Sequence, residues 1–254
     1  MFFINKVVWI TGASSGIGEA LTYEFARQGA RLIISSNQQN ELEKVQGRCM
    51  EMGAECFIQY LDVTAIDQMP SITEKLINKF KKIDVLVNNA GISQRSLAVE
   101  TSLEIDRKIM EIDYFGTIAL TKTVLPYMIK NGGGYIATTS SISGKFGFPL
   151  RSAYSAAKHA LHGFFETLRA EVYQHNIKVL IAFPGRIKTN ISMHALTKDG
   201  TAHGKMDEGQ NTGISAEKCA KQYLKAIRKD KKEVLIGSSE LLMVYIHKFL
   251  PGLF

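Results

Sequence analysis

The chain has 254 residues, of which 45% are hydrophobic and 22% are charged. These are the proportions of an ordinary globular protein, and the length is enough to bury a large core without disulfide bonds or metals. Part of the formal net charge of +7 lies in short clusters at residues 79–82 and 218–232. Such clusters are typical of exposed helix faces, so we expect no nucleic-acid partner.

Short runs of β-branched and apolar residues alternate with longer helical patterns, which predicts βαβ units and a parallel sheet. The predicted strands are Val7–Thr11, Arg31–Ser35, Glu55–Tyr60, Ile83–Asn88, Gly134–Ser140, Lys178–Phe183 and Glu233–Ile236. The predicted helices are Ile17–Gln28, Gln39–Met52, Ile66–Phe80, Leu103–Lys130, Ser152–His175 and Ala216–Arg228. Together they predict an α/β fold in which residues 1–254 form a single, doubly wound Rossmann domain with a seven-stranded parallel sheet.

Two segments near the C-terminus fall outside this alternation. The irregular stretch Ser192–Gly213 follows the sixth strand, and long inserts of this kind are usually functional, so we expect a substrate lid over about residues 190–213. The apolar tail Leu241–Phe254 is too short to span a bilayer. It could cover the substrate pocket, pack on a partner subunit or lie on a membrane surface, and we favour the first two.

The cysteines and the N-terminal residues bear on the compartment. Cys49, Cys56 and Cys219 form no Cys-x-x-Cys pair, which favours reduced thiols. A strand pattern begins at Lys6, which argues against a signal peptide. We therefore expect a cytoplasmic protein without a transmembrane segment.

A glycine-rich turn joins the first strand to the first helix. It contains Gly12, Ser14, Ser15, Gly16, Ile17 and Gly18. Glycines at such a turn let the backbone approach a pyrophosphate, and the helix N-terminus offers free N–H groups and the positive end of its dipole. The motif predicts a dinucleotide site, and the alternative is a flexible turn that binds nothing.

The residues after the second strand normally select the cofactor. An acidic residue there binds the ribose 2′-OH of NAD, and an arginine binds the 2′-phosphate of NADP. This chain has neither, because Ser36 and Asn37 occupy the position. We favour NADP, since no acid repels its phosphate and the nearby hydroxyl and amide groups can donate to it, and NAD is the alternative.

Tyr154 and Lys158 are spaced so that both side chains lie on one face of a helix, one turn apart. A free phenol, with a pKa of about 10, is too weak a base near neutral pH. An ammonium group about 4 Å away stabilises the phenolate by about 4 kcal/mol at an effective dielectric constant near 20. Ser141 follows the predicted fifth strand and can stabilise charge on a substrate oxygen. The three residues predict acid–base catalysis at a carbonyl or alcohol.

The order and spacing of these motifs resemble the short-chain dehydrogenase/reductase family over essentially the whole chain. The segments that carry the resemblance are Thr11–Gly18, Asn88–Gly91, Ser141, Tyr154-x-x-x-Lys158 and Pro184-Gly185. Several stretches are similar to the branch that holds dehydrogenase/reductase SDR family member 7B and, more distantly, the 11β-hydroxysteroid dehydrogenases. This resemblance implies that further residues hold the cofactor, namely Asp62, Val63, Asn88, Ala90, Gly91, Pro184, Gly185, Ile187 and Thr189, together with Tyr154 and Lys158.

The chain departs from the family pattern at two positions. Asn37 stands where the family usually has an arginine, and Asp113 stands where a catalytic asparagine is usual. Asp113 could keep the asparagine's backbone role in the proton relay, or its carboxylate could pair with Lys158 and weaken the effect of that lysine on Tyr154. We expect the relay to survive.

These patterns favour an NADP-dependent oxidoreductase that interconverts a hydrophobic ketone or aldehyde and an alcohol. Two alternatives are a non-catalytic redox sensor and a sugar-nucleotide epimerase or dehydratase, but the latter usually has a different glycine spacing and a larger C-terminal domain. Apolar positions on the predicted helices Leu103–Lys130 and Ser152–His175 favour a homodimer or homotetramer. We interpret His159 and His162 as packing or surface residues, and expect no metal site.

Overall fold

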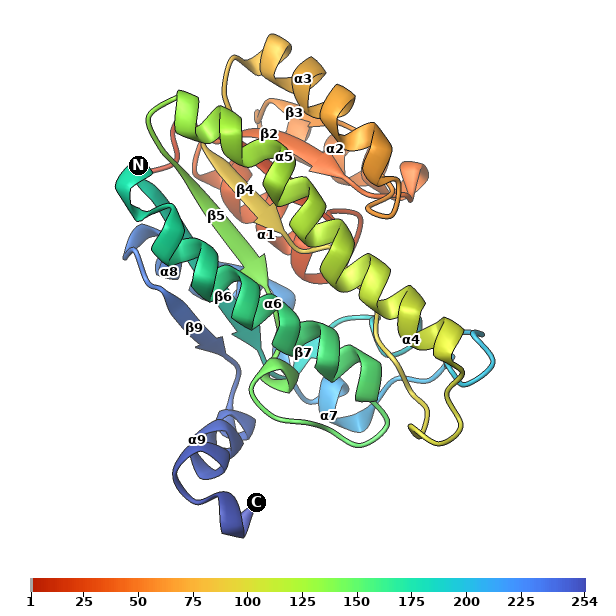
Figure 1. Cartoon of the computed structure of the whole chain (residues 1–254). Coiled ribbons are helices and arrows are strands. Elements are labelled where there is room, and N and C mark those ends of the chain that lie inside the picture. Colours follow the sequence, from red (N-terminus) through yellow and green to blue (C-terminus); the bar gives the residue numbers. More distant parts are fainter. Residues whose placement is uncertain (1) are drawn as a thin grey trace.

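Seven parallel strands form the central sheet of the computed structural model, which describes residues 2–254. Their spatial order is β3-β2-β1-β4-β5-β6-β9 (Figure 1). The strands are β1 (Val7–Thr11), β2 (Arg31–Ser35), β3 (Cys56–Ile58), β4 (Val85–Asn88), β5 (Gly134–Thr139), β6 (Ile177–Pro184) and β9 (Glu233–Ile236). This order confirms the predicted doubly wound Rossmann fold, and it reverses direction between β1 and β4.

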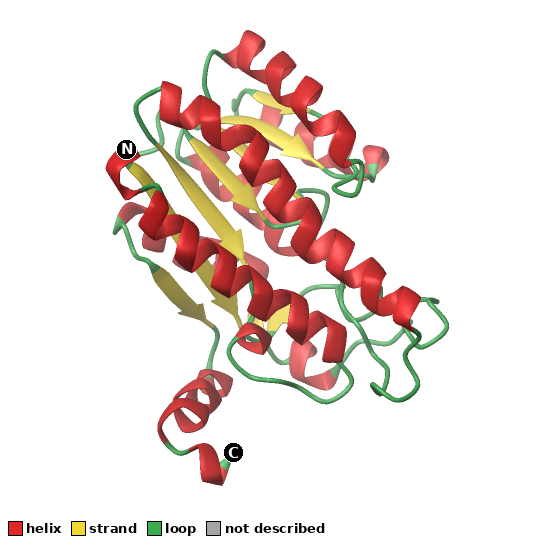
Figure 2. Ribbon diagram, in the orientation of Figure 1, coloured by secondary structure: helices red, strands yellow, loops and turns green. Residues whose placement is uncertain are grey.

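Helices cover both faces of the sheet (Figures 1 and 2). One face packs against α1 (Gly16–Arg27), α2 (Gln39–Glu51) and α8 (Ala216–Arg228), and the other against α3 (Met69–Phe80), α5 (Gly116–Lys130) and α6 (Ser152–Glu171). Strand β1 is almost entirely apolar because both of its faces are buried. Val8 and Ile10 enter the first core, while Val7 and Trp9 enter the second, because successive side chains point to opposite faces.

Several element boundaries differ from the sequence prediction. Strand β3 is shorter than Glu55–Tyr60 because it is an edge strand that pairs with β2 alone. The predicted helix 66–80 is a 3₁₀ turn (Ile66–Gln68) followed by α3, and α6 ends before a separate 3₁₀ turn (Tyr173–His175). The predicted helix 103–130 consists of α4 (Leu103–Met110), a π-helical turn (Glu111–Phe115) and α5. Single π-turns inside α-helices frequently mark functional positions.

The insert 192–213 has little regular structure. It contains the short helix α7 (Glu208–Asn211) and is flanked by β7 (Ile187–Lys188) and β8 (Ile214–Ser215), which pair with each other. Leu196 bridges to both Gln94 and Ala202, so the insert is tied to the loop after β4.

The tail forms α9 (Leu242–Phe249) and two 3₁₀ turns, Ser239–Leu241 and Pro251–Leu253, that the sequence prediction did not include. It projects below β9 in Figure 1 and packs on the loop after β5, where the rings of Phe146 and Phe254 are 4.9 Å apart. Among residues 2–254, none of the side chains lining the main cleft comes from this tail, so our expectation that it covers the pocket was wrong. No helix in the described part of the chain is long and apolar enough to cross a membrane.

Candidate active site

A cleft of about 740 Å³ lies at the carboxyl edge of the sheet, where the strand order reverses. Most of the residues predicted to form the site line it: Gly12, Ser14, Ser15, Gly16, Ile17, Ser36, Asn37, Asp62, Val63, Ala90, Gly91, Ser141, Tyr154, Lys158, Pro184, Gly185, Ile187 and Thr189. Gly18, Asn88 and Asp113 lie behind its wall. Asn88 is buried and donates to Thr121 Oγ1 at 2.8 Å, so it braces the wall from within.

The glycine-rich turn needs its glycines for two different reasons. Gly12 and Gly16 have φ values of +61° and +58°, a backbone region that favours glycine. A Cβ on Gly12 would also lie 2.7 Å from the Cα of Ala90, so the turn and the loop after β4 touch through their backbones. Gly18 has ordinary helical geometry, but a Cβ there would overlap the carbonyl oxygen of Gly12. The turn is therefore a close-packed cradle at the start of α1, as phosphate binding requires.

We predict that Gly18→Ala destabilises the protein and loosens this cradle. The new methyl group would overlap the Gly12 carbonyl and approach Asn89 Nδ2 to 2.6 Å, and such overpacking costs about 2 kcal/mol. Thermal unfolding should show a loss of about 4–8 °C in Tm, together with weaker dinucleotide binding. Gly47→Ala in α2 is the matched control because nothing lies within 4 Å of its Cβ position, and its Tm should stay level or rise. Equal Tm values for the two variants would contradict this packing argument.

Thr11 and Asn89 join the glycine-rich turn to the loop after β4, and neither was among the predicted site residues. Thr11 Oγ1 accepts from the backbone N–H groups of Asn89 and Ala90 at 3.0 and 3.1 Å. Asn89 Nδ2 lies 3.3 Å from the carbonyl oxygens of both Thr11 and Gly12. The two consecutive asparagines at the end of β4 were the available signal, but only the strand order shows that Asn89 faces the first turn.

Hydroxyl and amide groups surround the end of the cleft that follows β2 and β3. Ser14 Oγ and Ser36 Oγ are 2.9 Å apart, and Asn37 is exposed beside them. Asp62 accepts from the backbone N–H and the hydroxyl of Thr64 at 2.9 and 2.7 Å. These bonds and one from Asn37 lower the pKa of Asp62. Among the described lining residues from positions 36–38 and 61–64, Asp62 carries the sole charge.

We predict that Asn37→Arg shifts cofactor preference toward NADPH. Ser36 and Asn37 are neutral, so a 2′-phosphate bound here has no positively charged partner. A guanidinium at position 37 would supply that positive charge. The ratio of kcat/KM for NADPH over NADH should rise by about 10-fold or more, mainly through a lower KM for NADPH. Asn37→Gln is the matched control and should leave the ratio within about 3-fold. An unchanged ratio in Asn37→Arg would show that the 2′ position does not lie beside residue 37.

Ser141, just after β5, and Tyr154 and Lys158, near the start of α6, all line the cleft. Tyr154 and Lys158 lie one turn apart on α6, and Lys158 Nζ is 5.5 Å from the centre of the tyrosine ring. Lys158 is buried and also donates to the Thr139 carbonyl oxygen at 3.4 Å. Ser141 Oγ accepts from Ser143 N at 3.1 Å, and its contact to the Pro184 carbonyl oxygen is long, at 3.5 Å. The serine hydroxyl can therefore turn toward a ligand at little cost.

Asp113 pairs with Lys158. This was one of the two alternatives that the sequence left open for its carboxylate. Asp113 Oδ2 is 3.0 Å from Lys158 Nζ, and Oδ1 accepts from Ile92 N at 2.8 Å. The carboxylate is fully buried and comes from the π-helical turn between α4 and α5. Burial acts to lower the pKa of Lys158, but the charges of Asp113 and Tyr154 together outweigh it and raise that pKa. Gly91 packs over the pair, since a Cβ there would be 3.2 Å from Lys158 Nζ and from both carboxylate oxygens.

The loop after β4 also holds the start of α6. Gln94 is fully buried; its Oε1 accepts from Ala153 N at 2.9 Å and its Nε2 lies 3.2 Å from Ser152 Oγ. This side chain satisfies an otherwise unpaired N–H in the first turn of α6 and positions the helix that carries Tyr154.

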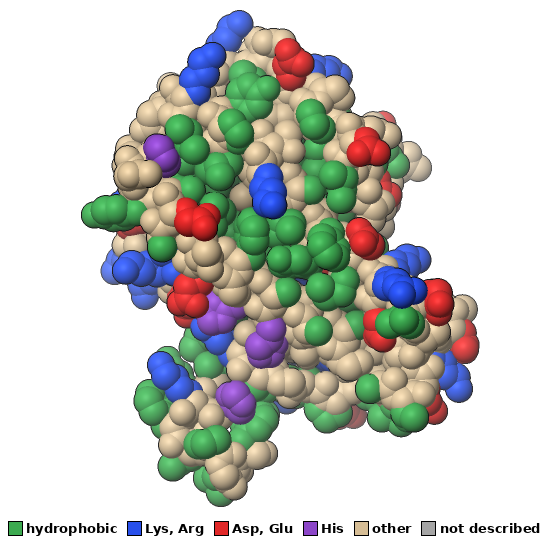
Figure 3. Space-filling view, viewed as in Figure 1, with side chains coloured by type: hydrophobic (Ala, Val, Ile, Leu, Met, Phe, Trp, Pro, Cys, Tyr) green, Lys and Arg blue, Asp and Glu red, His purple; other side chains and the backbone are tan. Residues whose placement is uncertain are grey.

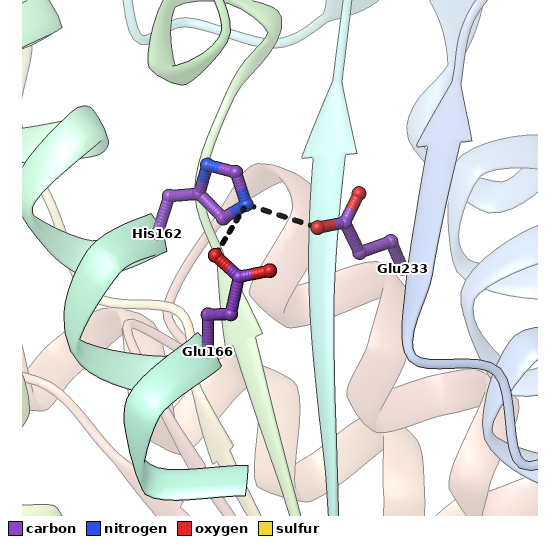
Figure 4. A group of neighbouring side chains, drawn as sticks. All are labelled: His162, Glu166 and Glu233. Carbon is purple, nitrogen blue, oxygen red and sulfur yellow. Dashed lines mark hydrogen bonds and ion pairs between the residues drawn. The ribbon is translucent and has the colours of Figure 1, made fainter. Parts of the chain in front are cut away.

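A second polar cluster joins α6 to β9 away from the cleft. Figure 4 shows His162, Glu166 and Glu233, whose ligand atoms lie within 4.8 Å of one another. Lys145 Nζ already lies among them, 2.9 Å from Glu233 Oε2 and 3.3 Å from His162 Nε2. The hydrogen bond from His162, together with Lys145, outweighs burial and lowers the pKa of Glu233 to about 2. The ammonium group supplies the positive charge that a metal would bring, so we interpret the cluster as an ion-pair network.

A doubly wound sheet with a glycine cradle at its switch point defines a dinucleotide-binding protein, and the tyrosine–lysine pair beside it indicates an oxidoreductase. The chain belongs to the short-chain dehydrogenase family, whose model matches residues 6–200.

Comparison with curated and solved proteins agrees with this assignment. The chain is 40% identical to dehydrogenase/reductase SDR family member 7B of Mus musculus, over 98% of this chain and 79% of that protein. It is 42% identical to a dehydrogenase/reductase SDR family protein 7-like of Anopheles gambiae, over 92% of this chain and 75% of that one. A short-chain dehydrogenase/reductase from Burkholderia phymatum, solved in complex with NAD, superposes with a TM-score of 0.88 at 22% identity, covering 100% of this chain and 96% of that one.

A fourth comparison concerns the cofactor. An alcohol dehydrogenase from Thermococcus sibiricus, complexed with 5-hydroxy-NADP, superposes with a TM-score of 0.79 at 26% identity, covering 92% of this chain and 97% of that one. Solved relatives thus include complexes with NAD and with an NADP derivative, and the protein is an oxidoreductase of a family that binds NAD(P).

Proposed function

We propose that the protein interconverts a hydrophobic ketone or aldehyde and the corresponding alcohol, with NADP(H) as the cofactor and Ser141, Tyr154 and Lys158 as the catalytic residues. One observation carries this proposal: Ser141, Tyr154 and Lys158 line the same cleft as the glycine cradle. A dinucleotide bound at the cradle would therefore share the cleft with the tyrosine. The same arrangement accounts for the match to dehydrogenases over residues 6–200.

The cleft suits a dinucleotide in shape and chemistry. The cradle leaves no room for side chains, and α1 presents its N-terminal N–H groups to a pyrophosphate. Ala90, Gly91, Pro184, Gly185, Ile187 and Thr189 line the wall toward Tyr154, where a nicotinamide would lie. When bound, NAD(P)H supplies the hydride that reduces a carbonyl carbon.

The side chains supply the proton chemistry. Tyr154 donates its phenolic proton to the carbonyl oxygen during reduction and takes it back during alcohol oxidation. The buried ammonium of Lys158 stabilises the phenolate that each reduction leaves behind. Ser141 donates a hydrogen bond to the same substrate oxygen as its charge develops. We assign Asp113 a positioning role, because it touches Lys158 and does not line the cleft.

We favour NADP over NAD on the residues that follow β2. Ser36 and Asn37 offer a hydroxyl and an amide to a 2′-phosphate, and no carboxylate of the described residues 36–38 repels it. Asp62 lies nearby; its Oδ1 accepts two hydrogen bonds from Thr64, and its side chain would meet the adenine. NAD is the alternative cofactor.

A redox sensor that binds the dinucleotide without turnover is the competing function. An activity assay distinguishes the enzyme from the sensor. The purified protein is mixed with NADPH or NADH and a panel of hydrophobic ketones and aldehydes while the absorbance of the reduced nicotinamide is followed. We expect one cofactor to be consumed with at least one carbonyl. Tight dinucleotide binding without consumption of either cofactor across the panel would favour the sensor. The intact tyrosine–lysine pair favours the enzyme, since a sensor has no use for it.

We also propose a homodimer or homotetramer. Figure 3 shows hydrophobic side chains gathered over α5 and its border with α6. Phe115 is 41% exposed there, and the ring of Tyr114 is 5.1 Å from that of Phe115 and 6.4 Å from that of Phe164. An apolar aromatic patch of this kind is typical of a subunit interface.

We propose a cytoplasmic location. Cys49, Cys56 and Cys219 form no disulfide, which favours the reducing cytoplasm.

A further inference from the structure

A side cavity adjoins the cleft where Ser141 and Tyr154 lie. Its volume is about 230 Å³, and Ser141, Tyr154 and Gly185 line both it and the main cleft. Its other lining residues include three apolar side chains and three arginines: Ile142, Phe148 and Ile191, and Arg95, Arg151 and Arg186. A molecule that contacts Ser141 and Tyr154 through one group can therefore extend a second group toward these arginines.

The charge in this cavity is unbalanced. Arg95 donates to Asp207 Oδ2 from Nε at 3.0 Å and from Nη2 at 2.5 Å, and Arg151 Nη2 donates to the same oxygen at 3.0 Å. Among the described residues that line the cavity, Asp207 is the one acid. Two guanidinium groups thus share one carboxylate, which leaves one positive charge uncompensated before the exposed Arg186 is counted.

The two arginines that bind Asp207 differ in how fully they are paired. Arg95, with 5% of its side chain exposed, also donates to Ser93 Oγ at 2.8 Å and to the Gln94 carbonyl oxygen. Within residues 2–254, the guanidinium of Arg151 makes one hydrogen bond, to Asp207, although its side chain is only 25% exposed. Burial and then the charge of Arg95 lower the pKa of Arg151. The free N–H groups of Arg151 would therefore be stabilised by an anion.

We propose that the substrate carries a carboxylate, which binds Arg151 in the side cavity while the carbonyl or hydroxyl group lies against Ser141 and Tyr154. This inference rests on the proposed function, because it assigns the second end of the same substrate. A carboxylate carries the single negative charge that the cavity lacks, and its two oxygens match the guanidinium fork. The substrate class is then a hydrophobic oxo acid and the corresponding hydroxy acid. In the reduction, the C=O group gains a hydride from the nicotinamide and a proton from Tyr154, and the carboxylate is unchanged.

The same ion pairs have a purely structural alternative. Asp207 belongs to the insert and directly precedes α7, which lies beside the start of α6 in Figure 1. Its bonds to Arg95 and Arg151 therefore also fasten the insert to the body. A fastening role alone requires loss of Arg151 to impair all substrates equally, whereas an anion site requires a loss confined to acids.

The test compares each oxo acid with its own methyl ester, in a series with different spacings between carbonyl and carboxylate. With NADPH, the wild type should show kcat/KM at least about 10-fold higher for the best acid than for its ester. Arg151→Gln should lower kcat/KM for that acid by about 30- to 100-fold, mainly through KM, and leave the ester within about 3-fold. Arg107→Gln, an exposed arginine on α4, controls for the loss of one positive charge.

Equal rates for acid and ester in the wild type, or an equal loss of both in Arg151→Gln, would overturn the anion site. Calorimetric titration of the same acids and esters into cofactor-saturated protein decides the question without turnover. Acid binding that is tighter than ester binding and is lost in Arg151→Gln supports the site, and equal binding of acid and ester overturns it. Absence of turnover with every pair would count against the proposed function alone.

Discussion

Tyr154→Phe should lower kcat by about 10³-fold or more while leaving dinucleotide binding within about 3-fold of the wild type. The phenylalanine ring fills the same buried space but has no proton to donate to the substrate oxygen. Because Tyr154 acts on the substrate oxygen in the proposed mechanism and is not part of the glycine cradle, the loss should appear in turnover more than in cofactor affinity. Stopped-flow reduction of a carbonyl substrate and titration of cofactor fluorescence measure the two quantities separately.

The matched control is Tyr173→Phe, which removes the hydroxyl of a tyrosine that is 78% exposed after α6. Its kcat should equal that of the wild type. Residual turnover within about tenfold of the wild type in Tyr154→Phe would show that another group delivers the proton, and would remove the central residue of the proposed mechanism.

Asp113→Asn should lower the free energy of unfolding by about 3 kcal/mol, because it removes the counter-ion of an ammonium group that stays buried. The side chains of Lys158 and Asp113 are 5% and 0% exposed, so water cannot replace the lost carboxylate. Urea denaturation of the cofactor-free protein measures the change. The double variant Asp113→Asn/Lys158→Met should recover most of the loss, since it removes both charges. A loss below about 1 kcal/mol in the single variant would contradict a tightly coupled pair.

The same variant also tests whether the carboxylate limits the proton relay. Asp113 Oδ2 lies 3.0 Å from the Lys158 ammonium, which stabilises the Tyr154 phenolate in the proposed mechanism. We expect the relay to survive, so kcat/KM for alcohol oxidation by Asp113→Asn should stay within about tenfold of the wild type.

Two other outcomes have distinct meanings. A loss well beyond tenfold would show that the carboxylate is needed to position Lys158. Sharply higher turnover would show that the carboxylate impairs the proton relay, against our expectation that the relay survives. Lys158 should remain charged at neutral pH in the wild type, because the charges of Asp113 and Tyr154 raise its pKa against the effect of burial.

The local sequence pattern was sufficient to predict the strands of the sheet. It also predicted the residues whose role depends on neighbours a few positions away in the chain. The strand β1, the turn after it and helix α1 are contiguous, so spacing alone places Gly12 and Gly16 at the start of a helix. Tyr154 and Lys158 share one face of α6 for the same reason. Local pattern did not foresee the π-helical turn at Asp113, because the apolar periodicity of residues 103–130 reads as one continuous helix.

The succession of strands and helices, the glycine cradle and the tyrosine–lysine pair could be predicted from the chain, because each depends on residues a few positions apart. Which distant side chains meet depends on the tertiary fold. Asp113 reaches Lys158, Asn89 reaches Thr11, and Asp207 reaches both Arg95 and Arg151. These pairs are 45 to 112 residues apart in the chain, so the parallel sheet and its crossovers, and no local rule, bring them together at one edge.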